Sequence, residues 1–212
     1  MKEKIIEICP LCNNPGKMFH KEEFFLCTRC CGIFRPKRTY PTPSDEKYRY
    51  EQHNNDVNDK RYQQFVSPIT SAILKEFLPE DTGLDFGAGT GPVISKLLKE
   101  NDYTIHQYDP FFHDNPVLLN KKYDYIVCCE VIEHFYHPYK EFELLKNLLN
   151  PKGILYCMTH IYKPDIPFAD WYYKKDPTHV FIYQKETFDW IKNQFDFSAI
   201  TIVDRLIRFL NR

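Results

Sequence analysis

The sequence predicts an α/β protein with a mostly parallel sheet, joined to a small cysteine-rich module at its N-terminal end. Short apolar runs alternate with helical patterns over the last two thirds of the chain, which is typical of a parallel sheet with crossover helices. A glycine-rich turn, Leu84–Gly91, joins the first of these apolar runs to a helix. Five of the eight cysteines lie between Cys9 and Cys31, apart from the alternating elements.

The N-terminal cysteines form two C-x-x-C pairs: Cys9, Cys12, Cys27 and Cys30. Each pair can direct two thiolates at one ion, and four thiolates make the closed tetrahedral shell of a structural Zn²⁺ site. We therefore expect a zinc-ribbon-like module at residues 1–40, with strands at Phe24–Leu26 and Gly32–Phe34. A segment of about 40 residues buries too little surface to fold alone, so the metal would supply stability. Cys31 adjoins the second pair and is not expected to be a ligand.

Basic residues outnumber Glu22 and Glu23 in this module: Lys17, Lys21, Arg29, Arg35, Lys37 and Arg38. They indicate either a nucleic-acid patch or the solvated surface of a small ribbon, and we favour the second interpretation. The net charge of the whole chain is −1, unlike that of many nucleic-acid binders. No run of 18 apolar residues and no signal-peptide pattern occurs, so we expect a cytoplasmic protein without a membrane partner.

Residues 41–66 read as a stiff, proline-marked linker followed by a lid-like helical segment that starts near Ser44. The tyrosines and histidine of this segment suit a lid and simple packing equally well: Tyr48, Tyr50, His53 and Tyr62. Helical spacing then predicts a helix that packs on the main domain, residues 67–212, through four apolar side chains: Ile69, Ile73, Leu74 and Phe77.

The main domain continues with strand and helix signals in alternation. We expect helices at Pro92–Glu100, Phe142–Leu149 and Thr187–Phe195. We expect strands at Thr104–Tyr108, Tyr125–Cys129 and Ile154–Thr159, and a closing hairpin from Phe197–Val203 and Arg205–Leu210.

Three glycines at alternate positions mark the turn after the first strand: Gly87, Gly89 and Gly91. Residues without Cβ let the backbone approach a ligand closely, and the following helix offers its unpaired N–H groups. The spacing is not the G-x-G-x-x-G of the dinucleotide fingerprint, so the context has to decide. Asp109 ends the next strand about 20 residues later, where a carboxylate would bind ribose hydroxyls. The alternative for Asp109 is a turn former before Pro110.

The ordered series Leu84–Gly91, Asp109 and Tyr123–His134 resembles class I S-adenosylmethionine (SAM)-dependent methyltransferases. Leu148–Leu155 resembles the turn into the fifth strand of that family, and Asp176–Val180 resembles a later segment of its small-molecule branch. The resemblance implies a Rossmann-like methyltransferase sheet that is mostly parallel and ends in an antiparallel hairpin.

The resemblance extends over about Ile69–Leu210 and implies a SAM site. Asp85, Gly87 and Gly89 would hold the methionine end, Asp109 would bind the ribose, and Glu130 would lie beside the sulfonium. The full set implied for the cofactor is Asp85, Gly87, Ala88, Gly89, Gly91, Asp109, Pro110, Phe111, Glu130 and Val131.

One segment departs from the family pattern. The family usually places a helix, a third strand and another helix after the ribose-binding residue, whereas only Pro110–Lys122 is present here. We expect a vestigial strand at Pro116–Leu119. Phe111 and Phe112 would stack on the adenine in place of the usual polar residue.

Methyl transfer to a hydroxyl or carbon nucleophile needs a base, whereas a neutral amine needs none. Among His134, His160 and His179, we expect His134 and His179 to act, with Glu133 as a third catalytic candidate, because they sit near the predicted mouth of the sheet. The segment Glu130–His134 also resembles ubiquinone-pathway O-methyltransferases, some of which bind a divalent metal there. A carboxylate and an imidazole can ligate such an ion.

The aromatic residues of Ile161–Asp176 suit either an active-site cover or packing beneath a loop. The leading function is methyl transfer from SAM to an oxygen, nitrogen or carbon of a small-molecule or carrier-bound acceptor. The alternatives are an RNA methyltransferase that binds RNA through the zinc module, and a SAM-binding protein without turnover.

Overall fold

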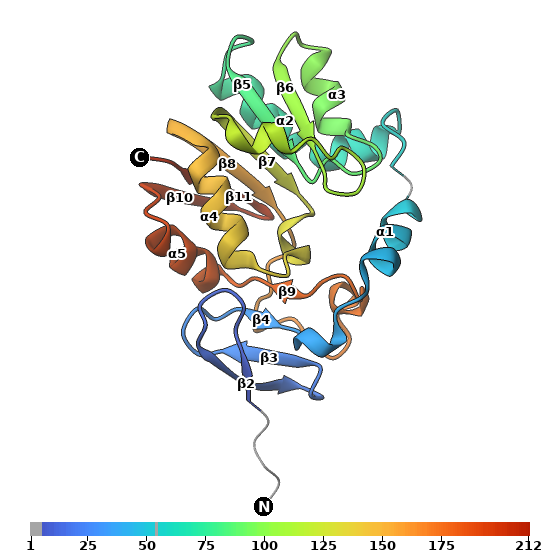
Figure 1. Cartoon of the computed structure of the whole chain (residues 1–212), viewed down its shortest axis with the longest axis vertical. Coiled ribbons are helices and arrows are strands. Elements are labelled where there is room, and N and C mark those ends of the chain that lie inside the picture. Colours follow the sequence, from blue (N-terminus) through green and yellow to red (C-terminus); the bar gives the residue numbers. More distant parts are fainter. Residues whose placement is uncertain (1–5, 54) are drawn as a thin grey trace, which may run out of the picture.

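The structure, a computed structural model, describes residues 6–53 and 55–212. Its larger part is an α/β unit built around a six-stranded sheet (Figure 1). The strands, in sheet order, are β10 (Ala199–Val203), β11 (Leu206–Leu210), β8 (Leu149–Met158), β7 (Tyr123–Cys129), β5 (Thr82–Phe86) and β6 (Thr104–Tyr108). β8, β7, β5 and β6 run parallel, and β11 is antiparallel to both neighbours. The expected parallel sheet with an antiparallel closing hairpin is confirmed.

Helices cover both faces of this sheet, because successive residues of a strand point to opposite faces. On β7, Tyr125 and Val127 pack with α2 and α3, whereas Ile126 and Cys128 belong to the apolar layer of α4 and α5. All four side chains are fully buried. These helices are α2 (Lys60–Glu76), α3 (Val93–Lys99), α4 (Pro138–Leu148) and α5 (Lys185–Gln194).

Helix α2 contains the apolar face that its spacing predicted, with one exception. Ile69 and Ile73 are fully buried, but Leu74 is 40% exposed. A step of one residue turns a helical side chain by about 100°, so Leu74 cannot share the face of Ile73. The expected boundary between residues 66 and 67 falls inside this helix, where Val66 is buried beside Ile69. The packing of α2 on the sheet therefore extends across that boundary, which stays a prediction.

The segment between β6 and β7 forms no strand, so the expectation of a vestigial strand at Pro116–Leu119 is wrong. Pro116–Asn120 is a short 3-10 helix, in which Leu118 is buried and Val117 is 63% exposed. A parallel strand needs a crossover of about a dozen residues on each side, and this segment has no room for two. Among the described strands, β6 therefore forms the edge of the sheet.

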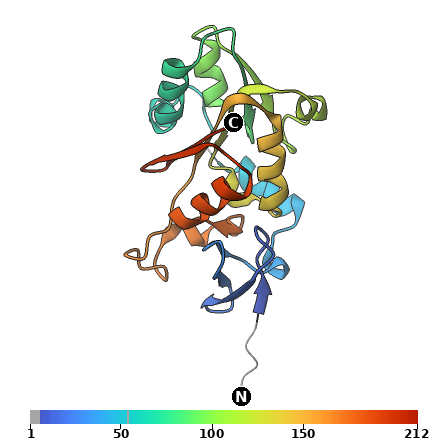
Figure 2. The same ribbon diagram turned by 90° about the vertical axis from the view of Figure 1, so that its left-hand side faces the viewer.

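The N-terminal residues form a second, smaller sheet that includes a strand from the far end of the chain. Its order is β1 (Ile6–Ile8), β2 (Pro15–His20), β3 (Phe24–Cys27), β4 (Ile33–Phe34) and β9 (Phe181–Ile182). The expected strands near residues 24–26 and 32–34 correspond to β3 and β4. Figures 1 and 2 agree that the blue N-terminal strands lie at the end of the molecule where α5 lies. The cysteine-rich module is thus completed by β9.

Helix α1 (Pro43–Glu51) connects the small sheet to the larger unit (Figure 1). The Thr42 hydroxyl accepts a hydrogen bond from the Asp45 N–H (3.3 Å), which caps the helix close to the start expected at Ser44. No helix in the described ranges is long and apolar enough to cross a membrane.

Candidate active site and cysteine cluster

The glycine-rich turn needs glycine at two positions for different reasons. Gly87 and Gly89 have φ angles of +80° and +61°, a region that L side chains rarely adopt. A Cβ on Gly87 would also lie 2.5 Å from the Val131 side chain, whereas one on Gly89 would project into open space. The N–H groups of Gly87 and Ala88 donate to the Tyr108 carbonyl (2.8 and 3.2 Å), which ties the turn to the end of β6.

This turn borders a cavity of about 800 Å³ at the carboxyl ends of the parallel strands. A cavity of this size suits a small-molecule ligand, and this sheet edge is where α/β folds bind ligands. Eight of the residues implied for the cofactor line it: Gly87, Ala88, Gly89, Asp109, Pro110, Phe111, Glu130 and Val131. Asp85 and Gly91 are not part of the wall.

Asp109 joins three backbone N–H groups at one wall of the cavity. Its Oδ2 accepts from Gly89 N (2.9 Å), and its Oδ1 accepts from Phe111 N (2.8 Å) and Phe112 N (3.1 Å). The turn-forming alternative is therefore realised in the structure. The same carboxylate lines the cavity, so the ribose role stays a prediction compatible with this geometry.

Asp85 and Gly91 act beneath the turn rather than in the cavity. The Asp85 carboxylate is buried and accepts a hydrogen bond from the Ser95 hydroxyl (2.7 Å) at the start of α3. Burial raises the pKa of Asp85 to about 6. A Cβ on Gly91 would lie 1.9 Å from the Asn55 carbonyl oxygen, so this glycine lets the α1–α2 connection lie directly on the turn.

His134 and His179 meet at the wall of the same cavity, with ring centroids 4.9 Å apart. His134 Nδ1 lies 3.0 Å from the Thr178 carbonyl, and His179 Nδ1 lies 2.7 Å from the Tyr173 carbonyl. A carbonyl can only accept, so both Nδ1 atoms donate, and the neutral form of such a ring carries its lone pair on Nε2. Burial lowers the pKa of His134 to about 4, so its ring is neutral at pH 7.

Glu133, the third catalytic candidate, is fully buried and does not line the cavity. Its carboxylate accepts hydrogen bonds from the Tyr173 hydroxyl (2.5 Å) and the Thr159 hydroxyl (3.0 Å). One carboxylate oxygen and one nitrogen of each imidazole, His134 and His179, lie within 4.8 Å of one another. This donor set could hold a divalent cation.

Two cavity residues, Glu46 and Arg205, were missed from the sequence. Glu46 and Tyr50 of α1 reach the cavity, where the Tyr50 hydroxyl donates to Glu46 (2.7 Å) and the Tyr50 ring packs edge-on against His134. Burial raises the pKa of Glu46. The i, i+4 spacing of this pair on one turn of a helix was the available signal.

The other missed residue, Arg205, lies beside two residues that the sequence did single out, His160 and Glu130. The Arg205 guanidinium donates to His160 Nε2 (2.9 Å), so this ring nitrogen is engaged. Glu130 has a φ of +52° and lies 3.8 Å from Arg205. Burial, together with the neighbouring Glu133, raises the pKa of Glu130 to about 8 despite the nearby guanidinium.

The aromatic residues of the segment after β8 divide between a buried cluster and the cavity. Phe168 and Trp171 are buried in an apolar cluster under the loop. Tyr172 and Tyr173 line the cavity, and Tyr172 is 61% exposed.

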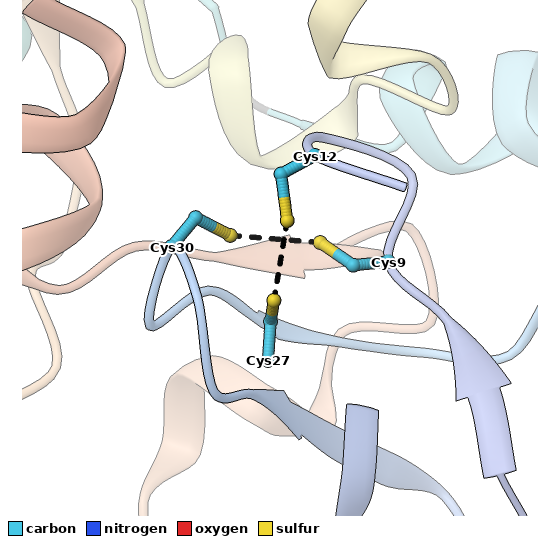
Figure 3. Close-up of side chains that lie close together, drawn as sticks. All are labelled: Cys9, Cys12, Cys27 and Cys30. Atoms are coloured by element: carbon cyan, nitrogen blue, oxygen red, sulfur yellow. Dashed lines mark hydrogen bonds between the residues drawn. The ribbon is translucent and has the colours of Figure 1, made fainter. Parts of the chain in front are cut away.

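The four cysteine sulfurs of the N-terminal module point toward one another (Figure 3). The Sγ atoms of Cys9 and Cys30 lie 3.6 Å apart, and those of Cys12 and Cys27 lie 3.3 Å apart. These distances are too long for disulfides and close to the ~3.8 Å between thiolates on one tetrahedral Zn²⁺. Cys31 lies outside the cluster, as expected.

Two of the six basic residues in this module are engaged in intramolecular contacts. Arg35 donates to two carbonyls of the larger unit, and Arg38 forms an ion pair with Glu7. Arg35 is therefore directed toward the larger unit, whereas the side chain of Arg38 remains about half exposed.

The comparisons with known proteins agree with this fold and cavity. The model of the Methyltransferase domain family matches residues 58–202, more than half of the chain, so the chain belongs to this family. No significant match exists among curated protein sequences.

Two solved structures illustrate the shared fold. One is an O-methyltransferase family protein from Burkholderia thailandensis (12% identity, TM-score 0.51, 79% of this chain and 66% of that chain). The other is magnesium protoporphyrin IX methyltransferase from Synechocystis PCC 6803 with bound SAH (14% identity, TM-score 0.55, 83% and 97%). At these identities the likeness establishes the methyltransferase fold and does not specify an acceptor.

Proposed function

We propose that this protein transfers the methyl group of SAM to a small-molecule acceptor whose nucleophilic atom gives up a proton, such as a hydroxyl. The observation that carries the proposal is the shared cavity. The glycine turn, Asp109 and two imidazoles whose Nδ1 atoms are engaged with backbone carbonyls all line it.

The cofactor half of the cavity would hold SAM in the orientation usual for its family. Gly87 and Gly89 would hold the methionine portion through their backbone, and Asp109 would bind the ribose hydroxyls. Phe111 and Phe112 supply aromatic faces for the adenine, because the shortened segment after Asp109 adds no further strand there.

In the reaction, the acceptor atom attacks the methyl carbon in line with the C–S bond, and the sulfur keeps the bonding electrons as S-adenosylhomocysteine (SAH) forms. The proton of the acceptor passes to Nε2 of His134 or His179. Hydrogen bonds from their Nδ1 atoms to Thr178 and Tyr173 hold both rings in the tautomer that can accept it.

Methyl transfer can be tested with SAM labelled on the methyl group and a panel of small hydroxylated and amine-containing metabolites. We expect His134→Asn and His179→Asn together to lower kcat by about 100-fold or more, a typical contribution of general base catalysis, while SAH affinity stays unchanged. His20→Asn in the N-terminal sheet is the matched control. Full turnover by the double variant would refute the base assignment, and failure to bind SAH would refute the proposal itself.

We propose that Cys9, Cys12, Cys27 and Cys30 hold one structural Zn²⁺. Four thiolates leave no open position for a substrate, so this ion would stabilise the fold and take no part in chemistry. Metal analysis of protein purified without chelator should find about one zinc per chain, and Cys27→Ser should lower that content.

A further inference from the structure

We infer that the four-cysteine module positions part of the active site. It holds the loop that carries His179, and Arg35 is the positioning residue. The structural part of this inference is that the module keeps residues 174–183 in a fixed conformation, and it can be tested without an acceptor. Its effect on turnover rests on the function proposed above.

Five consecutive residues after the second cysteine pair, residues 31–35, contact the segment 174–184 of the larger unit. The Cys31 carbonyl accepts from Gln184 Nε2 (2.6 Å). Gly32 lies so close to the Phe181 ring that an added Cβ would be 2.2 Å from it. Ile33 and Phe34 then pair as β4 with β9. The second cysteine pair of the proposed metal site therefore leads directly into the residues that contact the segment 174–184.

Arg35 ends this run with three hydrogen bonds to the backbone of the segment. Its N–H donates to Val180 O (2.9 Å), its Nε donates to His179 O (3.2 Å), and its Nη2 donates to Lys174 O (2.8 Å). The guanidinium lies 4.4 Å from the centroid of the Phe24 ring. Among the described residues no carboxylate lies within ion-pair distance of Arg35. The guanidinium therefore serves to fix the backbone on both sides of the turn that ends at His179.

The opposite side of the same segment holds the catalytic candidates. The Thr178 carbonyl accepts from His134 Nδ1 (3.0 Å), and the Val180 N–H donates to the Glu133 carbonyl (3.0 Å). The Tyr173 carbonyl accepts from His179 Nδ1 (2.7 Å). The segment is thus clamped between the module on one side and residues 132–134 on the other.

Apolar packing couples the two sides further. Phe24 and Ile33 of the module share one buried cluster with five residues of the segment after β8: Tyr162, Phe168, Trp171, Tyr173 and Ile182. A module of this size depends on its metal for folding, so loss of the metal would remove this packing and release the segment. A merely adjacent module would leave the His179 loop ordered.

Hydrogen exchange of the full-length, zinc-loaded protein tests the connection through Arg35. We expect Arg35→Gln to keep its zinc and its SAH affinity, and to raise the exchange rates of residues 174–183 about tenfold or more. Arg35→Lys, which keeps one donor, should restore part of the protection. Arg38→Gln is the matched control, because Arg38 lies in the same module and contacts Glu7 and Glu22 instead.

Where an acceptor has been found, Arg35→Gln should lower kcat about tenfold or more, since misplacing a base by about 1 Å has effects of that order or larger. Unchanged exchange at 174–183 in Arg35→Gln, or loss of zinc in that variant, would overturn the inference. Loss of protection without any SAH binding or methyl transfer would instead refute the proposed function and leave the coupling intact. Removing zinc from the wild-type protein should raise exchange in the same segment, and protection that survives zinc removal would also overturn the inference.

Discussion

At the scale of single residues, Asp109 combines two tasks that the sequence presented as alternatives. Its carboxylate organises the glycine turn and the Phe111–Phe112 pair through three N–H groups, and it also faces the cavity. An amide cannot accept at both oxygen positions, so Asp109→Asn would set an NH₂ group against a backbone N–H. We expect SAH affinity to fall by about 10- to 100-fold, which corresponds to about 1–3 kcal/mol.

Isothermal titration calorimetry with SAH measures this loss. Asp114→Asn, in the exposed part of the same segment, is the control and should bind like the wild type. Equal affinities for the two variants would show that Asp109 is only a turn former.

His134 gives a prediction about pH and stability. Its pKa is about 4 in the folded protein and near 6.5 when unfolded, so the unfolded state binds more protons between these values. Stability therefore falls as the pH drops through this window. Relative to His134→Gln, the wild type should lose about 2 kcal/mol of unfolding free energy between pH 7 and pH 5. Urea unfolding of both proteins at the two pH values checks the difference, and a constant difference would contradict it.

At the scale of elements, helix α1 lines part of the cavity and is joined to the segment after β8 by an ion pair. Arg49 donates through Nε and Nη2 to Asp176 Oδ2 (3.1 and 2.8 Å). Burial opposes ionisation of Asp176, but hydrogen bonds from Thr178 and Arg49 outweigh it and hold the pKa of Asp176 well below its usual range. Asp176 also fixes Thr178, whose carbonyl accepts from His134. Helix α1 and the histidine pair are therefore linked through Asp176.

We expect Arg49→Gln to raise hydrogen exchange of residues 43–51 by about tenfold, because a partly buried ionic contact then loses its charge. Arg61→Gln is the matched control, since Arg61 forms an exposed ion pair with Asp59 at the start of α2. Similar exchange in both variants would mean that α1 is held by packing alone.

The helices and strands also show which parts of the fold could be predicted from the sequence and which could not. The glycine turn, the C-x-x-C pairs and the strands β5 to β8 carry local signals of spacing and periodicity, and the structure agrees with them. β9 has only two residues and pairs with β4 across most of the chain, so no local pattern could reveal it. Likewise, Arg35 read as one surface charge among six, and only the tertiary structure places it against the His179 loop.

At the scale of the whole molecule, β9 makes the cysteine module and the larger unit share a sheet. The module also shares a hydrophobic cluster with the loop after β8, so neither part has an independent core on that side. This arrangement predicts that the zinc-loaded protein unfolds in one cooperative transition, in spite of its two sheets.

Differential scanning calorimetry tests this cooperativity. We expect one transition for the zinc-loaded protein, and a melting temperature lower by on the order of 10 °C after chelation, because metal binding contributes directly to the folding free energy. Cys9→Ser is the matched control, since the chelator should change its melting temperature little once a ligand is missing. Two resolved transitions, of which only the smaller responds to the chelator, would mean that the module folds separately and that β9 does not couple the two sheets.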